Sequence, residues 1–395
     1  MKKLAIIGFG PRGLHALECL CKELAEKNKS CKITIFENRN EYGTSFVWDT
    51  KQPDSNWVNI SERGLKNLKG RDKIKFKNFE IEKFPSYHTW NKNQFSILEN
   101  KDAFPARNKI GTYLKERANS LISILKQEKV ISIIQSLITD IDLNNTKVIL
   151  KDIKDKSFNF DEILLTIGHQ TTSLDKDIKK YQKQSLKGKN TLLESTYPTE
   201  NLIHSKHINT NTTIAIRGFG LAMIDAVRAL TIERGADFKI TDATILTSKF
   251  VANKKIPRKI IPYSLDGLPV VPKPFNKEID GIFSPSKKQL KKFKDCVLNV
   301  AKGKTEVEDS IFLKNILAEI SAEIYVEYKQ DNELTLKETK ELILLWFNNS
   351  NFKHPLIQDS EINTLTLLES YAYMACNKKE ISLDYFVGQI IRQCQ

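Results

Sequence analysis

Two glycine-rich turns constrain the fold of this chain more than any other feature of its sequence. The first is Gly8-Phe9-Gly10-Pro11-Arg12-Gly13, and the second, Arg217-Gly218-Phe219-Gly220, follows about 210 residues later. Each turn lies between a short apolar run and a helical pattern, which is the order of a unit that binds a dinucleotide. We therefore predict an α/β fold with two Rossmann-like dinucleotide-binding units.

The first turn has the spacing G-x-G-x-x-G. Gly8 permits a tight turn, Gly10 leaves room for a pyrophosphate, and Gly13 lets the following helix pack closely on the strand. Pro11 suits the first position of that helix, where no amide hydrogen is needed, and Arg12 follows it. We expect the first-turn amides and the positive end of the helix dipole to face phosphates.

An acidic residue ends the next strand. Residues 32–36 alternate between polar and apolar and end in two apolar residues, which predicts a strand. Glu37 follows this strand, 24 positions beyond Gly13. A carboxylate at this place can accept hydrogen bonds from an adenosine ribose. A later run, residues 163–167, predicts a buried strand that brings Gly168 to the carboxyl end of the sheet, where ligands of open α/β sheets bind.

The second turn is less complete. Residues 213–217 predict its strand, Gly218 and Gly220 form the turn, and residues 221–233 predict a helix. Met223 occupies the place of the third glycine. A purely structural turn without a ligand therefore stands as the alternative.

The strand predicted after this helix, residues 243–248, ends at Ser248 and Lys249. An NAD site usually has a carboxylate at this point, whereas a basic group attracts the 2′-phosphate of NADPH. The second unit therefore favours NADPH over NADH. Four further basic residues within 254–259 could serve in place of Lys249.

The net charge of +14 could indicate a nucleic acid or an anionic membrane as partner. Only eleven of the 62 basic residues are arginine, and the lysines are spread along the chain. Such lysines most often form a solvated surface, so we expect no nucleic acid as partner. The sequence has no run of eighteen apolar residues and no signal-peptide pattern, so we expect a cytoplasmic protein that does not bind membranes.

The six cysteines show neither zinc-ligand spacing nor C-x-x-C, so we expect reduced thiols and no metal site. Cys19 and Cys21 lie in the helix after the first turn, which is the wrong place for the redox pair of a disulfide reductase.

Residues 51–112 are irregular and rich in aromatic and turn residues, and residues 286–395 are mainly helical. Two apolar stripes at helical spacing in the latter region predict core positions, Ile316, Ile320 and Ile324 in one and Leu342, Leu345 and Trp346 in the other.

Five motifs appear in a distinctive order. They are Ile6-Ile7-Gly8-Phe9-Gly10-Pro11-Arg12-Gly13-Leu14, Gln52-Pro53 with Asn59, Phe104-Pro105-Ala106-Arg107 with Gly111 and Tyr113-Leu114, Thr166-Ile167-Gly168-His169, and Arg217-Gly218-Phe219-Gly220-Leu221 with Asp225. Over about residues 4–270 this order resembles a bacterial family of FAD/NAD(P)-binding proteins akin to the flavin-dependent N-hydroxylating monooxygenases, which includes amino-acid N-hydroxylases and a urate hydroxylase. The chain departs from that family at Ser248-Lys249-Phe250, where Ser-Gly-Arg is usual.

The resemblance implies an FAD-binding domain over residues 1–205, with an active-site segment at 51–112. It also implies an NAD(P)H-binding domain over 206–285 and a helical region, 286–395, that packs on the FAD domain. FAD and NADPH would be the cofactors, with molecular oxygen and a small-molecule substrate as partners and a homo-oligomer as a further possibility.

The implied activity is hydroxylation of a small polar metabolite through a flavin C4a-hydroperoxide, with N-hydroxylation of an amino acid or amine favoured. One alternative is an NAD(P)H:acceptor flavin oxidoreductase that transfers no oxygen. The other is a non-catalytic nucleotide- or RNA-binding flavoprotein.

Four residues are candidates for contacts near the reacting groups. Gln52 and Asn59 resemble residues beside the isoalloxazine ring, with a surface glutamine and a turn asparagine as the alternatives. Arg107 could hold a substrate carboxylate or a cofactor phosphate, or form a salt bridge at the start of a helix. His88 could deprotonate an ammonium substrate, or be an ordinary loop histidine.

Overall fold

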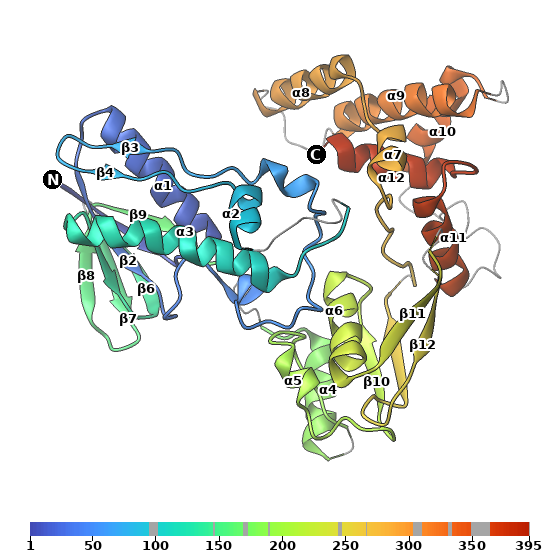
Figure 1. The fold of residues 1–395 in the computed structure, drawn as a ribbon, viewed down its shortest axis with the longest axis horizontal. Helices are drawn as coiled ribbons and strands as arrows, with labels where there is room; N and C mark the ends of the chain where they lie inside the picture. The colour runs from blue at the N-terminus through green and yellow to red at the C-terminus, as the bar shows by residue number, and fades with distance from the viewer. Residues whose placement is uncertain are drawn as a thin grey trace. The chain divides into compact units, whose positions relative to one another are not determined.

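The computed structural model of the chain (Figure 1) describes residues 1–94, 102–144, 147–168, 173–188, 190–243, 247–265, 267–302, 310–330, 334–348 and 364–394. These residues form two compact units. The first comprises Met1–Thr210 with Asp225–Gly235, and the second comprises Asn211–Ile224 with Ala236–Gln395.

A four-stranded parallel sheet is the centre of the first unit. Its strands lie in the order β5 (Ile131–Ile134), β2 (Cys31–Phe36), β1 (Lys2–Ile7) and β9 (Glu162–Leu165). Helix α1 (Pro11–Glu26) connects β1 to β2, and α3 (Arg107–Gln127) precedes β5. This is the βαβ arrangement that the first glycine-rich turn predicts.

The two faces of this sheet pack against different layers. Ile6, Ile33 and Ile35 share a core with the apolar faces of α1 and α3. Ala5 and Ile7 point to the other face and share a second core with the antiparallel strands β6 (Ile138–Asn144), β7 (Lys147–Asp152) and β8 (Ser157–Phe160). Because successive side chains of a strand point to opposite faces, burial on both sides requires an uninterrupted apolar run.

Short elements complete the first unit. They are the 3₁₀ turns η1 (Phe46–Trp48), η2 (Gly64–Asn67) and η3 (Ile232–Arg234), the strands β3 (Ile74–Lys75) and β4 (Glu80–Ile81), and the helices α2 (Tyr87–Gln94), α4 (Lys176–Leu186) and α5 (Glu200–Ile203).

The second unit contains two small sheets and a group of helices. Strands β10 (Thr213–Arg217) and β13 (Lys259–Tyr263) pair in parallel, and β11 (Asp237–Asp242) and β12 (Thr247–Val251) form an antiparallel hairpin. Helix α6 (Leu221–Leu230) follows the second glycine-rich turn, and its residues from Asp225 onward belong to the first unit. The remaining helices are α7 (Lys277–Ile282), α8 (Lys287–Lys302), α9 (Ser310–Lys329), α10 (Leu336–Asn348), α11 (Thr364–Cys376) and α12 (Leu383–Cys394).

The described elements confirm the predicted α/β class and the mainly helical C-terminal region. The predicted domain boundaries at 205 and 285, and the packing of residues 286–395 on the FAD domain, stay predictions. The stripe Ile316, Ile320 and Ile324 is confirmed as core. The second stripe is wrong at Leu342 and Leu345, which are 47% and 68% exposed, because α10 buries Thr339 and Ile343 instead. Its third residue, Trp346, is partly buried and packs against the core that contains Ile343.

The strand predicted to follow α6 also differs. We expected a strand over residues 243–248 that ends at Lys249, whereas Lys249 lies within β12, opposite Lys239, and the parallel partner of β10 is β13. The reason is the pattern of the two segments. Residues 237–242 alternate between polar and apolar, which is typical of a half-exposed hairpin, and the apolar pair Ile260-Ile261 supplies the parallel strand. Residues 244–246 and His169 lie outside the described residues.

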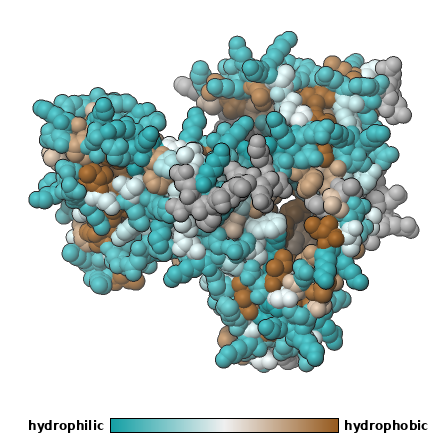
Figure 2. Space-filling view, in the orientation of Figure 1, coloured by the Kyte–Doolittle hydropathy of each residue, from teal (hydrophilic) through white to brown (hydrophobic). Residues whose placement is uncertain are grey.

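The face of the molecule in Figure 2 is mostly hydrophilic, with smaller hydrophobic patches. This agrees with a lysine-rich, solvated surface. None of the helices that the structure describes is long and apolar enough to cross a membrane.

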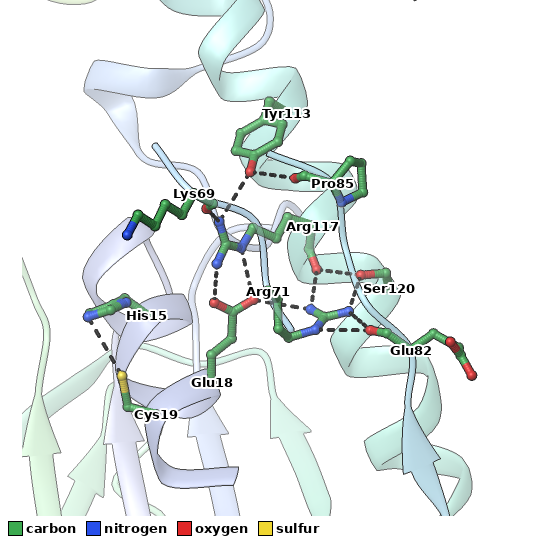
Figure 3. A network of polar contacts seen from close by, with 10 residues as sticks. All are labelled: His15, Glu18, Cys19, Lys69, Arg71, Glu82, Pro85, Tyr113, Arg117 and Ser120. Atoms are coloured by element: carbon green, nitrogen blue, oxygen red, sulfur yellow. Dashed lines mark hydrogen bonds and ion pairs between the residues drawn. The ribbon is translucent and has the colours of Figure 1, made fainter. Parts of the chain in front are cut away.

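A buried ion-pair network holds the irregular segment after η2 against the helices of the first unit (Figure 3). The Glu18 carboxylate on α1 lies 2.6 Å from Nη2 of Arg117 on α3 and 3.1 Å from Nη1 of Arg71. The side chains of Glu18, Arg71 and Arg117 are 8%, 4% and 10% exposed. Burial lowers the pKa of Arg71, although the negative charge of Glu18 acts to raise it.

Carbonyl and hydroxyl groups accept hydrogen bonds from the other guanidinium donors. Arg71 donates to the Glu82 carbonyl at 3.1 Å, and Arg117 donates to the Lys69 carbonyl at 2.7 Å. Because a buried charge is costly without partners, this network fixes residues 69–82 in one position against α1 and α3.

Replacing Glu18→Gln should destabilise the protein by about 3–5 kcal/mol, because two buried guanidinium groups then lose the one carboxylate that pairs with them among the described residues. Thermal unfolding followed by circular dichroism measures the change. The control is Glu23→Gln on the same helix, which removes an exposed pair with Lys27 and should leave the melting temperature nearly unchanged. Equal shifts in the two variants would contradict the role of the network.

Candidate functional site

The first glycine-rich turn is so tightly packed that two of its positions exclude any side chain. Gly8 has φ +85°, in the left-handed region, and a Cβ there would lie 2.7 Å from the Thr166 carbonyl oxygen. A Cβ at Gly13 would lie 2.7 Å from the Gly8 carbonyl oxygen. At Gly10 the nearest atom, the Thr44 carbonyl oxygen, would be 3.2 Å away, so this position is constrained less by the protein itself.

Thr166 joins the end of β9 to this turn. Its amide donates to the Ile7 carbonyl at 2.9 Å, and its hydroxyl donates to the Gly8 carbonyl. Gly168, two residues later, has φ +68°, and a Cβ there would meet no atom within 4 Å. The structure therefore brings Gly168 near the same sheet edge as Gly8, as predicted. The predicted burial of residues 163–167 is wrong, since Leu165 and Ile167 are 49% and 45% exposed, because β9 is an edge strand of the sheet.

Glu37 lies directly beside the turn. Its carboxylate accepts hydrogen bonds from the amides of Phe9 at 2.7 Å and Arg39 at 3.0 Å. An ionised carboxylate has about four acceptor sites, so capacity remains for ribose hydroxyl groups. Its position at the end of β2 matches the sequence prediction, and its contact with a ribose stays a prediction.

Pro11 and Arg12 are the first residues of α1, and Arg12 is exposed. A cation near a helix N-terminus is unfavourable because it meets the positive end of the dipole. The first turn of α1 contains no acidic residue that would compensate. A bound phosphate would supply the missing negative charge.

Gln52 is buried and holds a turn together. Its side-chain amide donates to the carbonyls of Val47 at 2.8 Å and Phe46 at 3.2 Å, and its Oε1 accepts from Nδ2 of Asn56 at 3.0 Å. The alternative of a surface glutamine is therefore wrong. Asn59, by contrast, is exposed.

Arg107 is buried, and each of its three side-chain nitrogens makes a hydrogen bond or an ion pair. Its Nε donates to the Trp57 carbonyl at 3.1 Å, its Nη1 to the Tyr197 hydroxyl at 3.0 Å, and its Nη2 lies 2.6 Å from the Asp225 carboxylate. The arrangement matches the salt-bridge alternative. It leaves no open fork of N–H groups for a substrate.

His88 pairs with a buried carboxylate. Its Nε2 lies 3.4 Å from Glu62, which also accepts a hydrogen bond of 3.2 Å from the Tyr87 hydroxyl. Neither His88 Nε2 nor Glu62 Oε2 has a hydrogen-bond partner among the described residues, and a role of His88 as a base stays a prediction.

Three residues near this segment were missed by sequence reasoning. Asn56 is fully buried and donates to the Thr199 hydroxyl at 3.1 Å. Trp57 is 45% exposed, and the Arg228 guanidinium lies over its ring, 3.3 Å from the centroid. Asn56 and Trp57 stand between the selected Gln52 and Asn59, but no local pattern links them to a residue 171 positions away.

The second glycine-rich turn is open. Gly218 has φ +103° and its amide donates to the Tyr263 carbonyl at 2.6 Å. A Cβ at Gly218 or Gly220 would meet no atom within 4 Å. Ser248 and Lys249 lie on the β11–β12 hairpin, a sheet separate from β10–β13, so their NADPH contacts stay predictions.

Among the described residues, no group of three or more His, Cys, Asp or Glu side chains is placed to hold a metal ion.

Residues 5–170 match the model of an FAD-NAD(P)-binding family. The match begins in β1 and ends just after the Thr166–Gly168 segment, so it contains the whole first turn, Glu37 and the closing strand of the sheet. It confirms the predicted resemblance to FAD/NAD(P)-binding proteins, with FAD and NAD(P) as the class of cofactor.

Several solved structures show weak likeness to the chain. Tmm from Pelagibacter sp. strain HTCC7211 is 12% identical, with 99% of this chain and 90% of that one covered and a TM-score of 0.35. OTEMO, in complex with FAD and NADP, is 11% identical over 58% and 36% of the two chains, with a TM-score of 0.34. Lysine monooxygenase NbtG from Nocardia farcinica is 16% identical over 43% and 32%, with a TM-score of 0.21.

The chain covers 32%, 36% and 53% of the length of the first three solved structures that it matches. No curated protein matches it. These likenesses are too weak to transfer an activity.

Replacing Gly13→Ala should lower the melting temperature, although alanine favours helix by up to about 1 kcal/mol, because its Cβ would meet the Gly8 carbonyl oxygen at 2.7 Å. The matched control is Gly220→Ala, where the Cβ enters open space and stability should be unchanged or slightly higher. Thermal unfolding of both variants tests the difference. A Gly13→Ala variant as stable as the parent would contradict the packing described for this turn.

Proposed function

We propose that this chain is an FAD- and NADPH-dependent monooxygenase that hydroxylates a small polar metabolite, with the nitrogen of an amino acid or amine as the favoured target. The observation that carries the proposal is the first glycine-rich turn. There Gly8 and Gly13 admit no side chain, and Glu37 and the first turn of α1 flank the space beyond Gly10.

The residues of the first unit fit FAD. The amides and dipole of α1, with Arg12, would bind the pyrophosphate, and Glu37 would bind the ribose. A segment that begins beside Gly10, at Thr44, exposes 72% of Phe46 and 41% of Val47. Large exposed apolar side chains of this kind commonly mark a surface that a ligand covers.

When bound, FAD supplies the electrons that activate molecular oxygen, and NADPH supplies the hydride that reduces FAD. The chain's own residues bind and orient these groups. Gln52 and Asn56 keep residues 46–57 in one conformation through their hydrogen bonds. That rigidity holds the shape of a site from which water must be excluded.

The second turn supports NADPH as the reductant. Gly218 and Gly220 form an open turn at the start of α6, with space where a pyrophosphate would approach. Lys249 is proposed as the contact to the 2′-phosphate, and the basic residues within 254–259 are the alternative. Asn59 is proposed to lie beside the isoalloxazine ring, and His88 is proposed as the base for an ammonium group of the substrate.

The purified wild-type protein should be yellow and should oxidise NADPH faster when its substrate is present. A panel of amino acids and amines, read by NADPH consumption and by mass spectrometry for a gain of about 16 Da from one oxygen atom, tests this. NADPH oxidation with an electron acceptor but no oxygenated product would favour the reductase alternative. A colourless protein that binds no added FAD would overturn the proposal.

Two glycine substitutions should separate the two cofactors. Gly10→Val should abolish FAD binding, since its side chain would occupy the space beside Thr44 that a pyrophosphate needs. Gly220→Ala should keep FAD and raise the KM for NADPH about tenfold, equivalent to about 1.4 kcal/mol of lost binding. Flavin absorbance per protein and steady-state kinetics measure both effects, and full FAD content in Gly10→Val would refute the placement of FAD.

A further inference from the structure

Arg228 and Trp57 form a stacked pair on the surface of the first unit. The guanidinium carbon lies 3.3 Å from the centre of the indole ring, and Trp57 is 45% exposed. Arg228 is half-buried, and its Nη1 donates to the Ser55 carbonyl at 3.1 Å. Stacking fixes the plane of the guanidinium and leaves its edges for hydrogen bonding.

No carboxylate of the described residues lies within ion-pair distance of Arg228. Asp225, one helical turn earlier on α6, is held by Arg107 at 2.6 Å and by the Tyr197 hydroxyl. Glu233 accepts a hydrogen bond of 3.3 Å from the Ser55 amide. Burial lowers the pKa of Arg228, although the charge of Asp225 raises it. Arg228 is therefore a partly desolvated cation whose nearest acidic neighbours already have other partners.

Two buried polar atoms next to this pair have no hydrogen-bond partner within the described part of the chain. They are Oγ of Ser55 and Oδ1 of Asn56, the two residues before Trp57. Buried polar atoms are nearly always hydrogen-bonded, so each such atom requires an explanation, such as a bound water or ligand. Both atoms belong to the residues directly before Trp57. Oδ1 of Asn56 only accepts, so its missing partner is a donor such as water, whereas Oγ of Ser55 can also donate.

Arg107 cannot take this role, because its three side-chain nitrogens already bind Trp57, Tyr197 and Asp225. Trp57 belongs to the same hydrogen-bonded segment, residues 44–57, that begins beside Gly10 and contains Gln52. The stacked pair and the proposed FAD site therefore share one continuous stretch of backbone.

We propose that Arg228, stacked on Trp57, binds the α-carboxylate of the substrate, so that the substrate is an amino acid and not a simple amine. This inference rests on the proposed function. The planar guanidinium presents parallel N–H groups that match the two oxygens of a carboxylate, and the substrate supplies the negative charge that Arg228 lacks. Arg228 then contacts only the carboxylate, and the substrate nitrogen that is proposed to react makes no contact with it.

The test uses FAD-loaded protein and a panel of L-amino acids, each paired with the amine that lacks its α-carboxylate, such as L-lysine with cadaverine and L-ornithine with putrescine. The wild type should prefer one amino acid over its matching amine. Arg228→Gln should lower kcat/KM for that amino acid about tenfold to a hundredfold, mainly through KM, and change the value for the amine little. Arg228→Lys, which keeps the charge and loses the fork, should recover part of the loss.

The control is Arg234→Gln, which removes a half-buried arginine of the same unit whose guanidinium donates to the carbonyls of residues 202, 203 and 208. It should affect stability without changing the preference for the amino acid over the amine. An unchanged preference in Arg228→Gln, or a wild type that uses amine and amino acid equally, would overturn the inference.

Binding measured apart from turnover distinguishes failure of this inference from failure of the proposed function. Equilibrium dialysis of the same paired probes against the FAD-loaded wild type and Arg228→Gln reports binding directly. Amino-acid binding that depends on Arg228, without any oxygenated product, would support the carboxylate site and contradict the monooxygenase. Absence of such binding across the panel would overturn the site even if NADPH oxidation is observed.

Discussion

The first unit depends on the close approach of three backbone segments at Gly8, Gly13 and Thr166. The end of β1, the first turn of α1 and the end of β9 meet within contact distance, and the space between them is smaller than one methyl group. This approach aligns the carboxyl ends of the strands and directs the N-terminus of α1 at the same edge. Glu37 can reach the Phe9 amide only because β2 lies next to β1 in register. The geometry proposed to bind FAD is thus a consequence of missing side chains.

Helix α3 links this edge of the sheet to the segment that contains the candidate substrate site. Near its middle, Arg117 pairs with Glu18 on α1, and at its start Arg107 pairs with Asp225. The two arginines are ten residues apart, about 15 Å along the helix axis. Because both pairs are buried, a shift of α3 along its axis would break two ion pairs at once. The positions of the glycine-rich turn and of residues 52–57 are therefore coupled through one rigid element.

Local signals predicted the parts of the fold that depend on neighbours in sequence. The first turn, α1 and the position of Glu37 follow from glycine spacing and periodicity, which are readable over some thirty residues. The pairing of β10 with β13, the burial of Gln52 and the stacking of Arg228 on Trp57 involve residues that no periodic pattern connects. Strand pairing is decided by competition between distant segments, so the local pattern of residues 243–248 could not predict that β12 pairs with β11. The prediction for α10 was wrong at Leu342 and Leu345 for a similar reason, since the neighbours of a helix, and not its own sequence, decide which face is buried.

Charge compensation distinguishes the arginines that support the fold from those available to a ligand. Arg71, Arg107 and Arg117 each lie against a carboxylate of the chain and donate further hydrogen bonds to carbonyl or hydroxyl groups. Arg12 and Arg228 have no carboxylate within ion-pair distance in the described structure. Arg12 lies at the N-terminus of α1, and Arg228 is partly desolvated. Both positions are unfavourable for a cation unless an anion joins it. A dinucleotide phosphate at Arg12 and a carboxylate at Arg228 would each remove such a cost, so both ligands would bind where the folded chain alone leaves positive charge uncompensated.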